Sequence, residues 1–361
     1  MKKPHILMMA AGTGGHVFPA LAVSELLAER GAVIHWLGTA NGMENRLVAP
    51  THYAFHAIAM QGLRGKGIGR LLKMPITLLS ATMAVIKIIR SNKIDMMVGF
   101  GGYVSAPGGI AARMTGTPLI IHEQNAIAGM SNRYLAKIAT KVLQAFEGTF
   151  ANSELDPKLE TVGNPVRNAI TGVAAPTERY DINDDSPLRL LVVGGSLGAQ
   201  VLNATVPKAL GLLKRPLAVR HQCGRDNETV TQAAYDAEDL SIHQVTVQPF
   251  ITDMAAAYQW ADIIVCRAGA LTVTEIQNVG IAAIFVPLPS AVDDHQTANA
   301  RTLTEHNAAI LLPQAELTPK RLCDELATLN RHTCLAMAQK GHALANRSAS
   351  QQVADIIWQT L

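Results

Sequence analysis

The chain has 361 residues, a length that accommodates two domains of ordinary size. Its hydrophobic fraction of 48% and its charged fraction of 16% exclude a disordered or acidic solvating chain. The formal net charge of +3 is too small to indicate a nucleic-acid partner by itself. The four cysteines form no CxxC pair and no zinc-site spacing, so we expect free thiols in a reducing compartment.

Short apolar runs alternate with amphipathic stretches, which is the βαβα pattern of parallel sheets covered by helices. In the first half, these runs predict strands at residues 5–9, 33–37, 96–98 and 119–122. A helix is expected over residues 19–29, and a polar stretch at residues 177–186 interrupts the pattern. In the second half, strands are predicted at residues 188–193, 218–222, 245–248, 263–266 and 283–286. Because each half begins with a strand, a glycine loop and a helix, we predict an α/β fold with two Rossmann-like domains facing each other.

Three glycine-rich loops follow predicted strands, at residues 12–16, 99–109 and 194–198. Glycine lets the backbone turn tightly and approach a ligand closely, and the helix that follows each loop presents free N–H groups. One such loop is weak evidence, because glycine turns also serve plain strand-to-helix packing. Three together favour a site for a phosphate or diphosphate.

Two common nucleotide motifs are missing from these loops. The first loop lacks the acidic residue about 20 positions on that accompanies a dinucleotide-binding GxGxxG motif, and no loop ends in Gly-Lys-Ser/Thr. No Asp-x-Asp follows a strand to hold a metal–diphosphate, since Asp293 and Asp294 are adjacent. The missing motifs therefore argue against a dinucleotide oxidoreductase and an ATPase. If a diphosphate leaves without a metal, helix dipoles and backbone amides must stabilise it instead.

No segment is predicted to span a membrane. The longest weakly charged run lies around residues 75–86, whereas a spanning helix needs roughly 20 apolar residues.

Several motifs occur together and in a fixed order. They are Gly12-Thr13-Gly14-Gly15-His16, Gly101-Gly102-Tyr103-Val104-Ser105, His122-Glu123-Gln124-Asn125, Gly163-Asn164-Pro165-Val166-Arg167, Gly194-Gly195-Ser196-Leu197-Gly198-Ala199, Arg267-Ala268-Gly269-Ala270-Leu271-Thr272, and His295-Gln296 followed by Asn299-Ala300. In this order the chain resembles the MurG family of bacterial glycosyltransferases, which make lipid II for peptidoglycan. The resemblance runs from the N-terminus to about Ala300, and one departure is Ala11, where the family often has glycine.

The resemblance implies a GT-B fold, in which two Rossmann-like domains with parallel sheets face each other across a cleft. It implies an acceptor-binding domain at residues 1–163 and a donor-binding domain at residues 164–341, with a C-terminal helix at about 342–361 packing back on the first domain. The implied activity is that of an inverting hexosyltransferase, an N-acetylglucosaminyltransferase. It moves GlcNAc from UDP-GlcNAc to the 4-hydroxyl of MurNAc in undecaprenyl-diphosphate-MurNAc-pentapeptide (lipid I). The resemblance implies no cofactor and no metal essential to the chemical step.

The same resemblance implies a peripheral protein on the cytoplasmic face of the bacterial inner membrane, with roles in cell wall biogenesis, cell shape and cell division. Expected partners are UDP-GlcNAc, lipid I, an anionic membrane surface and other cell-wall synthesis and division proteins. Residues 63–90 offer a candidate membrane surface, because basic and apolar side chains interleave there. The residues proposed for it are Lys66, Arg70, Lys73, Ile76 and Leu79. The alternative is an ordinary helix that packs its apolar side on the sheet.

His16 is the candidate catalytic base, because it ends the first glycine loop and an imidazole titrates near the working pH. Asn125 is the second candidate catalytic residue, since its amide could orient the sugar or the attacking group. His122 and Glu123 are interpreted as residues that shape this loop. The acceptor-binding candidates are Gly14, Gly15, His16, Gly102, Tyr103 and Ser105. For Tyr103 and Ser105, core and turn packing is an equally good interpretation.

Candidate donor-binding residues come from both halves of the chain. Ser196 could donate to the diphosphate or cap the next helix, and Glu275 could accept from the ribose hydroxyls. The amides of Gln296 and Asn299 suit sugar hydroxyls and an N-acetyl group. The resemblance puts the backbone of Ile251 at the uracil. The full set is Thr13, Gly14, Gly15, Asn125, Arg167, Ser196, Ile251, Ala270, Leu271, Thr272, Val273, Thr274, Glu275, Gln296 and Asn299.

Three other functions stay open on the sequence. Another GT-B transferase could use a different lipid or small-molecule acceptor, such as diacylglycerol or a natural product, but the motif at residues 122–125 and the loop at residues 99–109 argue against it. A non-hydrolysing UDP-GlcNAc 2-epimerase has a similar fold with different motifs. A non-catalytic nucleotide-sugar sensor would not need His16, two glycine loops and a sugar site together.

Overall fold

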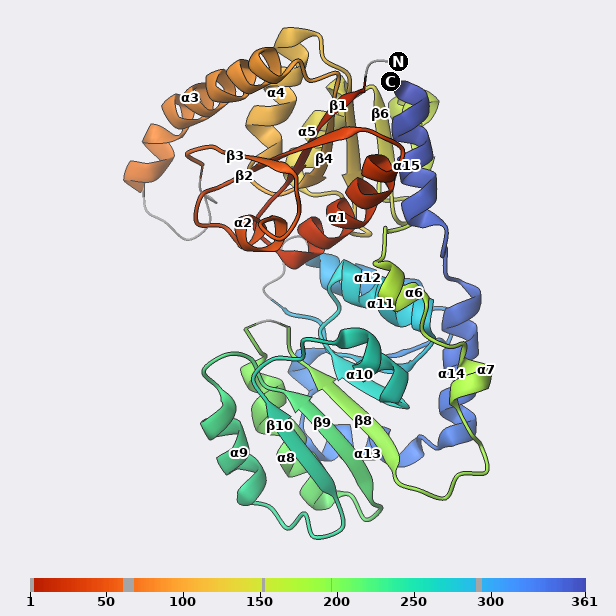
Figure 1. The fold of residues 1–361 in the computed structure, drawn as a ribbon. Coiled ribbons are helices and arrows are strands. Elements are labelled where there is room, and N and C mark those ends of the chain that lie inside the picture. Colours follow the sequence, from red (N-terminus) through yellow and green to blue (C-terminus); the bar gives the residue numbers. More distant parts are fainter. Residues whose placement is uncertain (1–2, 61–67, 151–152, 196, 290–293) are drawn as a thin grey trace. The chain divides into compact units, whose positions relative to one another are not determined.

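The computed structural model describes residues 3–60, 68–150, 153–195, 197–289 and 294–361 of the chain. The chain divides into two compact units, each with its own sheet (Figure 1). The first unit comprises Met1–Arg167 and Asn346–Leu361, and the second comprises Asn168–Ala345. The sequence-based boundaries were placed at 163/164 and 341/342, a few residues earlier in each case.

Within the described residues of the first unit, seven parallel strands form one sheet in the order β3-β2-β1-β4-β5-β6-β7. Their bounds are β1 His5–Ala10, β2 Val33–Gly38, β3 Ala54–Ala57, β4 Met96–Gly101, β5 Leu119–Glu123, β6 Lys141–Gln144 and β7 Leu159–Thr161. The central strands are buried on both faces, which explains their continuous apolar sequences.

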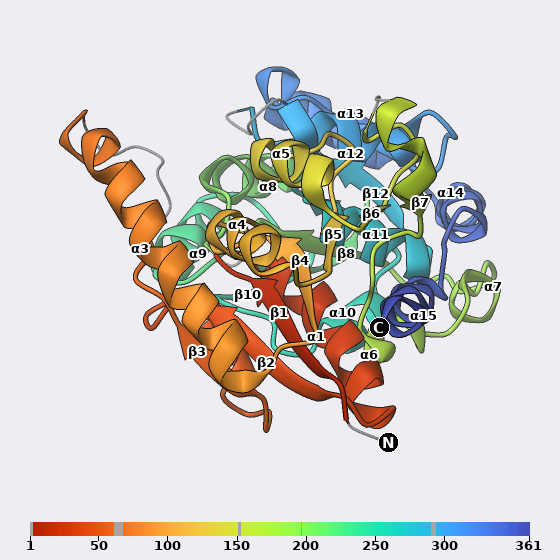
Figure 2. The same ribbon diagram turned by 90° about the horizontal axis from the view of Figure 1, so that it is seen from above.

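Helices cover both faces of this sheet (Figures 1 and 2). One core cluster joins α1 and α15 to one face, and a second joins α3, α4 and α5 to the other. The helices of the unit are α1 Gly14–Glu29, α2 Met43–Val48, α3 Ile68–Asn92, α4 Ser105–Thr115, α5 Met130–Ile138 and α15 Ala349–Thr360, with a 3₁₀ turn η1 at Ser153–Lys158.

The last helix, α15, belongs to the first unit although the second unit precedes it in the chain. Val353, Ala354 and Ile357 are fully buried in the cluster that α1 also supplies. Asp355 forms an ion pair with Arg30 at the end of α1, with 2.5 Å between the nitrogen and the oxygen. Apolar burial by these three side chains stabilises the docked helix by several kcal/mol, at roughly 1–3 kcal/mol for a fully buried aliphatic side chain.

In the part of the second unit that the structure describes, six parallel strands follow the order β10-β9-β8-β11-β12-β13. They are β8 Leu188–Val193, β9 Leu217–Gln222, β10 Gln244–Gln248, β11 Ile263–Cys266, β12 Ala282–Phe285 and β13 Ile310–Leu311. The helices are α6 Asn168–Thr171, α7 Pro176–Arg179, α8 Gln200–Leu212, α9 Glu228–Asp236, α10 Met254–Trp260, α11 Ala270–Val279, α12 His295–Thr304, α13 Pro319–Thr328 and α14 Arg331–Ala343, with a 3₁₀ turn η3 at Gln314–Glu316.

All nine predicted strands are present, with ends that differ by up to three residues. The prediction that the first helix begins at residue 19 was wrong, because α1 begins at Gly14 and Pro19 lies inside it. Two low-propensity glycines start this helix, and packing of its apolar face on the sheet overrides their intrinsic cost. The strands β3, β6, β7 and β13 were not predicted.

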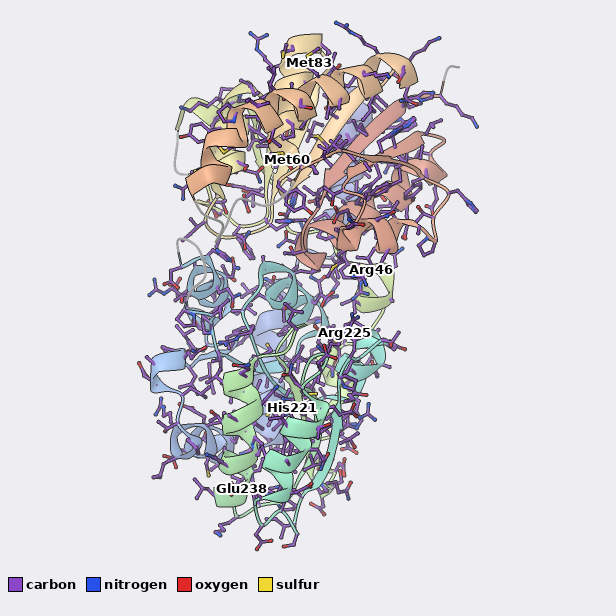
Figure 3. All side chains as sticks on the ribbon, turned by 90° about the vertical axis from the view of Figure 1, so that its left-hand side faces the viewer. Arg46, Met60, Met83, His221, Arg225 and Glu238 are labelled. Carbon is purple, nitrogen blue, oxygen red and sulfur yellow. The ribbon has the colours of Figure 1, made fainter. Side chains whose placement is uncertain are left out.

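Helix α3 runs along one side of the first unit (Figures 1 and 2). Its stretch Met74–Asn92 has the length and the mean hydropathy, 1.3, of a helix that could cross a membrane, which the sequence analysis did not expect. Ala81, Val85, Ile86 and Ile89 on this helix are buried against the sheet, and core helices have similar hydropathy. Figure 3 shows Met83 on the outer side of the helix.

Three histidines form a hydrogen-bonded row across neighbouring strands. His35 Nε2 lies 3.0 Å from His5 Nδ1, and His35 Nδ1 lies 3.0 Å from His56 Nε2. Each nitrogen pair shares one proton, so His35 donates on one side and accepts on the other when all three rings are neutral. Burial, with added repulsion from His56 and His5, lowers the pKa of His35 to about 4. His35 is therefore uncharged at neutral pH, where it can donate one hydrogen bond and accept the other at this edge of the sheet.

Candidate functional site

In both units the glycine loops lie where the strand order reverses. In the first unit, the loops after β1 and β4 leave adjacent strands at this switch point, and in the second unit the loops after β8 and β11 do the same. Parallel sheets bind ligands at the carboxyl ends of their strands at such points. The fold therefore places each predicted phosphate loop at a binding position of its own sheet.

The first loop is shaped by Gly12, whose φ is +93°. Helix α1 then begins at Gly14, with Thr13 as its N-cap and no side-chain cap on its first amides. Uncapped N-terminal amides and the helix dipole suit an anion. Thr13, Gly14 and Gly15 thus lie in the arrangement that a phosphate loop requires.

His16 lies in the first turn of α1 and not at the end of a loop, as the sequence analysis had placed it. Its Nδ1 is 3.0 Å from the carbonyl oxygen of Ala11. Because a carbonyl only accepts, Nδ1 carries the proton in the neutral ring, and the lone pair is on Nε2. The ring packs over Gly101, where an added Cβ would be 2.9 Å from Nε2. This tautomer is the one that a general base acting through Nε2 needs.

The backbone of the second glycine loop packs directly against the backbone of the first. Gly101 and Gly102 have φ values of +108° and +88°, and a Cβ on Gly102 would lie 2.2 Å from the carbonyl oxygen of Ala11. The ring of Tyr103 lies against Gly12, at 3.2 Å from the position of an added Cβ. Ser105 is fully buried in the first turn of α4, so its hydroxyl faces the interior of the unit.

Asn125 lies in a loop that the buried carboxylate of Glu123 organises. Glu123 Oε1 accepts from the backbone N and the Nδ2 of Asn125, at 3.0 and 3.1 Å. Its Oε2 accepts from Gly129 N and Asn132 Nδ2, at 3.0 and 2.8 Å. Glu123 thus shapes this loop, as the sequence analysis interpreted it.

Fully buried His122 connects this loop to the segment that ends the first unit. His122 Nε2 donates to the carbonyl oxygen of Gly163 at 2.9 Å, and Gln124 donates to Nδ1 at 3.1 Å. Burial lowers the pKa of His122 to about 4, so the ring is neutral at pH 7. Further along the segment, the guanidinium of Arg167 lies 4.6 Å from the ring centroid of Phe18 on α1. Arg167 therefore places a positive charge beside the first turns of α1.

The second unit has a pocket of about 280 Å³ at its switch point. Its lining residues are Val193, Gly194, Gly195, Gly198, Arg267, Gly269, Thr272, Leu288 and Gln296. The third glycine loop is tightly folded, since a Cβ on Gly198 would lie 1.9 Å from the carbonyl oxygen of Cys223. Gly269 is the N-cap of α11, which begins beside the pocket. Ser196 lies outside the described residues.

Two polar side chains that line this pocket also form hydrogen bonds with the backbone of neighbouring segments. Gln296 Oε1 accepts from the amides of Leu288 and Ala268, at 2.9 and 3.3 Å. Arg267 donates to the carbonyl oxygens of Val286 and Pro287, at 3.0 and 3.1 Å, and burial lowers its pKa without discharging a guanidinium. Arg267 begins one of the motifs that carry the family resemblance, but no role was predicted for it.

Three of the remaining donor candidates, Ile251, Glu275 and Asn299, are buried and are not among the residues that line the pocket, whereas Thr272 is. Asn299 is fully buried and donates to Ala268 O at 3.2 Å, and Glu275 is buried and accepts from the hydroxyl of Tyr258 at 2.9 Å. The Ile251 amide lies 3.3 Å from Gln222 Oε1. Along α11, Ala270, Val273 and Thr274 are buried, whereas Leu271 and Thr272 are partly exposed. Of the predicted α11 residues, Thr272 therefore contributes a pocket-lining side chain.

Among the described residues, no three His, Cys, Asp or Glu side chains are grouped so that they could hold a metal ion.

Comparison with known proteins gives consistent matches over the whole chain. Residues 6–144 match the glycosyltransferase family 28 N-terminal domain, and residues 189–357 match the glycosyltransferase family 28 C-terminal domain. A Psychrobacter arcticus protein is 84% identical over 100% of both chains, and an Acinetobacter baylyi protein is 50% identical over 100% of this chain and 98% of its own. Both are named UDP-N-acetylglucosamine–N-acetylmuramyl-(pentapeptide) pyrophosphoryl-undecaprenol N-acetylglucosamine transferase.

Solved structures with the same fold include the crystal structure of Acinetobacter baumannii MurG. It is 44% identical, with a TM-score of 0.86 and 99% of each chain covered. The calicheamicin glycosyltransferase CalG4 has a TM-score of 0.69 at 14% identity, covering 99% of this chain and 98% of its own, and shows the fold alone. The two Rossmann-like units are those of the GT-B architecture that the family resemblance implied.

Proposed function

The chain belongs to glycosyltransferase family 28, and from this membership we propose that it catalyses the reaction for which its relatives are named. It transfers GlcNAc from UDP-GlcNAc to the MurNAc 4-hydroxyl of undecaprenyl-diphosphate-MurNAc-pentapeptide, lipid I, and forms lipid II for peptidoglycan synthesis. The observation that carries the proposal is the 84% identity to a protein of that name over the full length of both chains.

The pocket of the second unit supports a role in binding the donor diphosphate. Two helices, α8 and α11, begin beside it, and the third glycine loop supplies close backbone approach. Both helix dipoles and the charge of Arg267 favour an anion there. As the sugar–phosphate bond breaks, negative charge grows on the departing UDP. Amides and Arg267 stabilise that charge, so the chemical step requires no metal.

His16 is proposed as the base that activates the acceptor. The 4-hydroxyl oxygen of MurNAc attacks C1 of GlcNAc from the face opposite the phosphate, and the configuration at C1 inverts. The hydroxyl proton passes to His16 Nε2, and the bond between C1 and the β-phosphate oxygen breaks to release UDP. The Nδ1–H bond to Ala11 O supports this assignment, because it stabilises the imidazolium that forms.

The first unit is proposed to dock on the cytoplasmic face of the inner membrane through the outer side of α3. Ile76, Leu79 and Met83 are 73%, 62% and 54% exposed on this helix. Lys66 lies outside the described residues, as do the side chains of Arg70 and Lys73, which supply the basic part of the proposal. Met114 on α4 is exposed as well. Docking there would bring the protein to the other cell-wall synthesis and division proteins that the family resemblance implies.

Vesicle binding tests this docking. Asparagine at both Ile76 and Leu79 should weaken binding to anionic vesicles at least tenfold, because each exposed apolar side chain contributes about 1 kcal/mol on entering the headgroup boundary. Val230 on α9, which is 73% exposed in the second unit, gives the matched control Val230→Asn. Equal binding by the double variant and this control would remove α3 from the proposal, and so would unchanged binding after charge reversal at Arg70 and Lys73.

Product analysis tests the activity itself. The protein is incubated with labelled UDP-GlcNAc, EDTA and either a short-chain lipid I analogue or diacylglycerol. We expect one GlcNAc to be added to the lipid I analogue for each UDP released, and no transfer to diacylglycerol. A folded protein that binds UDP-GlcNAc but glycosylates only another acceptor would contradict the proposal.

A further inference from the structure

Glu44, on the short helix α2, is a buried carboxylate that the reaction described above does not use. Its side chain is completely shielded from solvent, which is rare for glutamate unless the charge is paired or hydrogen-bonded. Glu44 is not among the predicted site residues.

Two glycines leave the space that the Glu44 side chain occupies. A Cβ on Gly38 would lie 2.7 Å from Glu44 Cγ, and a Cβ on Gly42 would lie 2.1 Å from Oε1. Real Cβ atoms essentially never approach other atoms this closely. The backbone after β2 is thus built around this carboxylate.

The carboxylate accepts three hydrogen bonds from two segments. Oε1 accepts from the backbone N and the hydroxyl of Thr39, at 2.9 and 2.8 Å. Oε2 accepts, at 3.2 Å, from the backbone N of Gly12. Gly12 lies in the first glycine loop. Hydrogen bonds to an ionised acceptor are roughly twice as strong as neutral ones, so these contacts hold the loop firmly.

The second glycine loop is connected to the same carboxylate through Thr39 and through the interaction of the Tyr103 hydroxyl with Glu44 itself. The hydroxyl of Tyr103 lies 3.2 Å from Thr39 Oγ1. Because Thr39 gives its only hydroxyl proton to Glu44, the Tyr103 hydroxyl is the donor in this contact. Burial raises the pKa of Tyr103, so the phenol keeps its proton at neutral pH.

His16 depends on both loops that Glu44 connects. Its Nδ1 bonds to the carbonyl of Ala11, the residue before Gly12, and its ring rests on Gly101 two residues before Tyr103. We propose that Glu44 is a positioning residue, whose carboxylate holds the two glycine loops in the arrangement that aims His16 Nε2 at the acceptor hydroxyl. The inference rests on the proposed function.

A consequence concerns the acceptor diphosphate. The amide of Gly12 already donates to an anion, so it does not serve a phosphate. The first-turn amides of α1, at Gly14 and Gly15, are the ones that the first loop offers to a ligand.

The test is Glu44→Gln, which preserves shape and removes the charge and one acceptor. We expect kcat to fall at least tenfold, with the dissociation constant of UDP unchanged within twofold because the donor pocket lies in the other unit. Asp355→Asn is the control, since it breaks the ion pair to Arg30 in the same unit away from both loops. Rates are compared well below the Tm of each variant, so a loss of stability alone does not lower kcat. A kcat of Glu44→Gln within twofold of the control would overturn the proposal.

A second measurement judges Glu44 without any turnover. Hydrogen exchange in the peptides covering residues 5–16 and 99–105 should accelerate at least fivefold in Glu44→Gln and not in Asp355→Asn. Unchanged exchange in both peptides would refute the role of Glu44 even if the wild type proved inactive. Wild-type inactivity with accelerated exchange would instead reject the proposed reaction and retain Glu44 as the residue that fixes the loops.

If Glu44→Gln does not fold, Thr39→Val replaces it, because valine keeps the shape of threonine and removes the connecting hydroxyl. Thr39→Val should lower kcat severalfold in the wild type and much less in the Tyr103→Phe background, since the same connection is already broken there. If Thr39→Val lowers kcat by the same factor in the wild type and in the Tyr103→Phe background, the proposed connection is contradicted.

Discussion

Replacing Gly101 with alanine isolates the placement of His16 from the stability of the fold. The new Cβ would lie 2.8 Å from His16 Cδ2 and 2.9 Å from Nε2, whereas ordinary contact begins at 3.4 Å. The imidazole must therefore withdraw by about half an ångström. A misplacement of about 1 Å in an active site can lower the rate roughly 100-fold, so we expect kcat to fall about tenfold.

Gly31 provides the matched control for backbone strain. Its φ of +95° is close to the +108° of Gly101, and nothing lies within 4 Å of its added Cβ. Both alanine variants should lose about 1–3 kcal/mol of stability from this backbone conformation. Steady-state transfer at saturating substrates, measured well below the lower Tm, separates the two effects. Equal kcat for Gly101→Ala and Gly31→Ala would refute the placement of His16 by the second glycine loop.

Two further predictions concern pH and the donor pocket. Burial lowers the pKa of three imidazoles to about 4: His35, His122 and His221. The unfolded rings take up protons near pH 6.5 and the folded rings only near 4, so stability is present above pH 6.5 and is lost as the pH falls toward 4. By pH 5 His122 and His221 should each lower the free energy of unfolding by about 2 kcal/mol, and His35, which is less deeply buried, should lower it by less. A free energy of unfolding in urea that is the same at pH 7.5 and pH 5 would contradict this. In the pocket, Gly198→Ala places a Cβ 1.9 Å from Cys223 O and should weaken UDP binding, measured by calorimetry, at least tenfold. The control Gly116→Ala, at a φ of +71° with nothing within 4 Å of the added Cβ, should leave UDP binding unchanged. A UDP dissociation constant that Gly198→Ala leaves unchanged would show that this loop does not shape the pocket.

The central strands and the glycine loops could be predicted because their signal is local. A strand such as β1, buried on both faces, must be continuously apolar, and Gly12 after it has a positive φ value that other residues rarely adopt. The short strands β3, β6, β7 and β13 carry no such pattern. In β6, for example, Lys141 and Gln144 flank two apolar residues, and pairing with β5 and β7 determines the strand.

The site was only partly predictable, because burial depends on contacts between distant segments. His16 and Thr272 could be identified from their place after a glycine loop or at a helix start. Asn299 has the right chemistry for a sugar, but the fold buries it against Ala268. Glu44 is an ordinary helix glutamate in sequence, and its role follows from glycines and amides that only the fold brings to it.

The most direct measurement is transfer of labelled GlcNAc from UDP-GlcNAc to a short-chain lipid I analogue, in EDTA, by the wild type and by His16→Ala. We predict that the wild type forms the lipid II analogue without a metal. The variant should bind UDP normally and lose roughly 100- to 10,000-fold in kcat, the usual contribution of a general base. Equal rates would keep the reaction and assign the base to another group. Folded wild-type protein that binds UDP-GlcNAc and forms no lipid II analogue would contradict the proposed function itself.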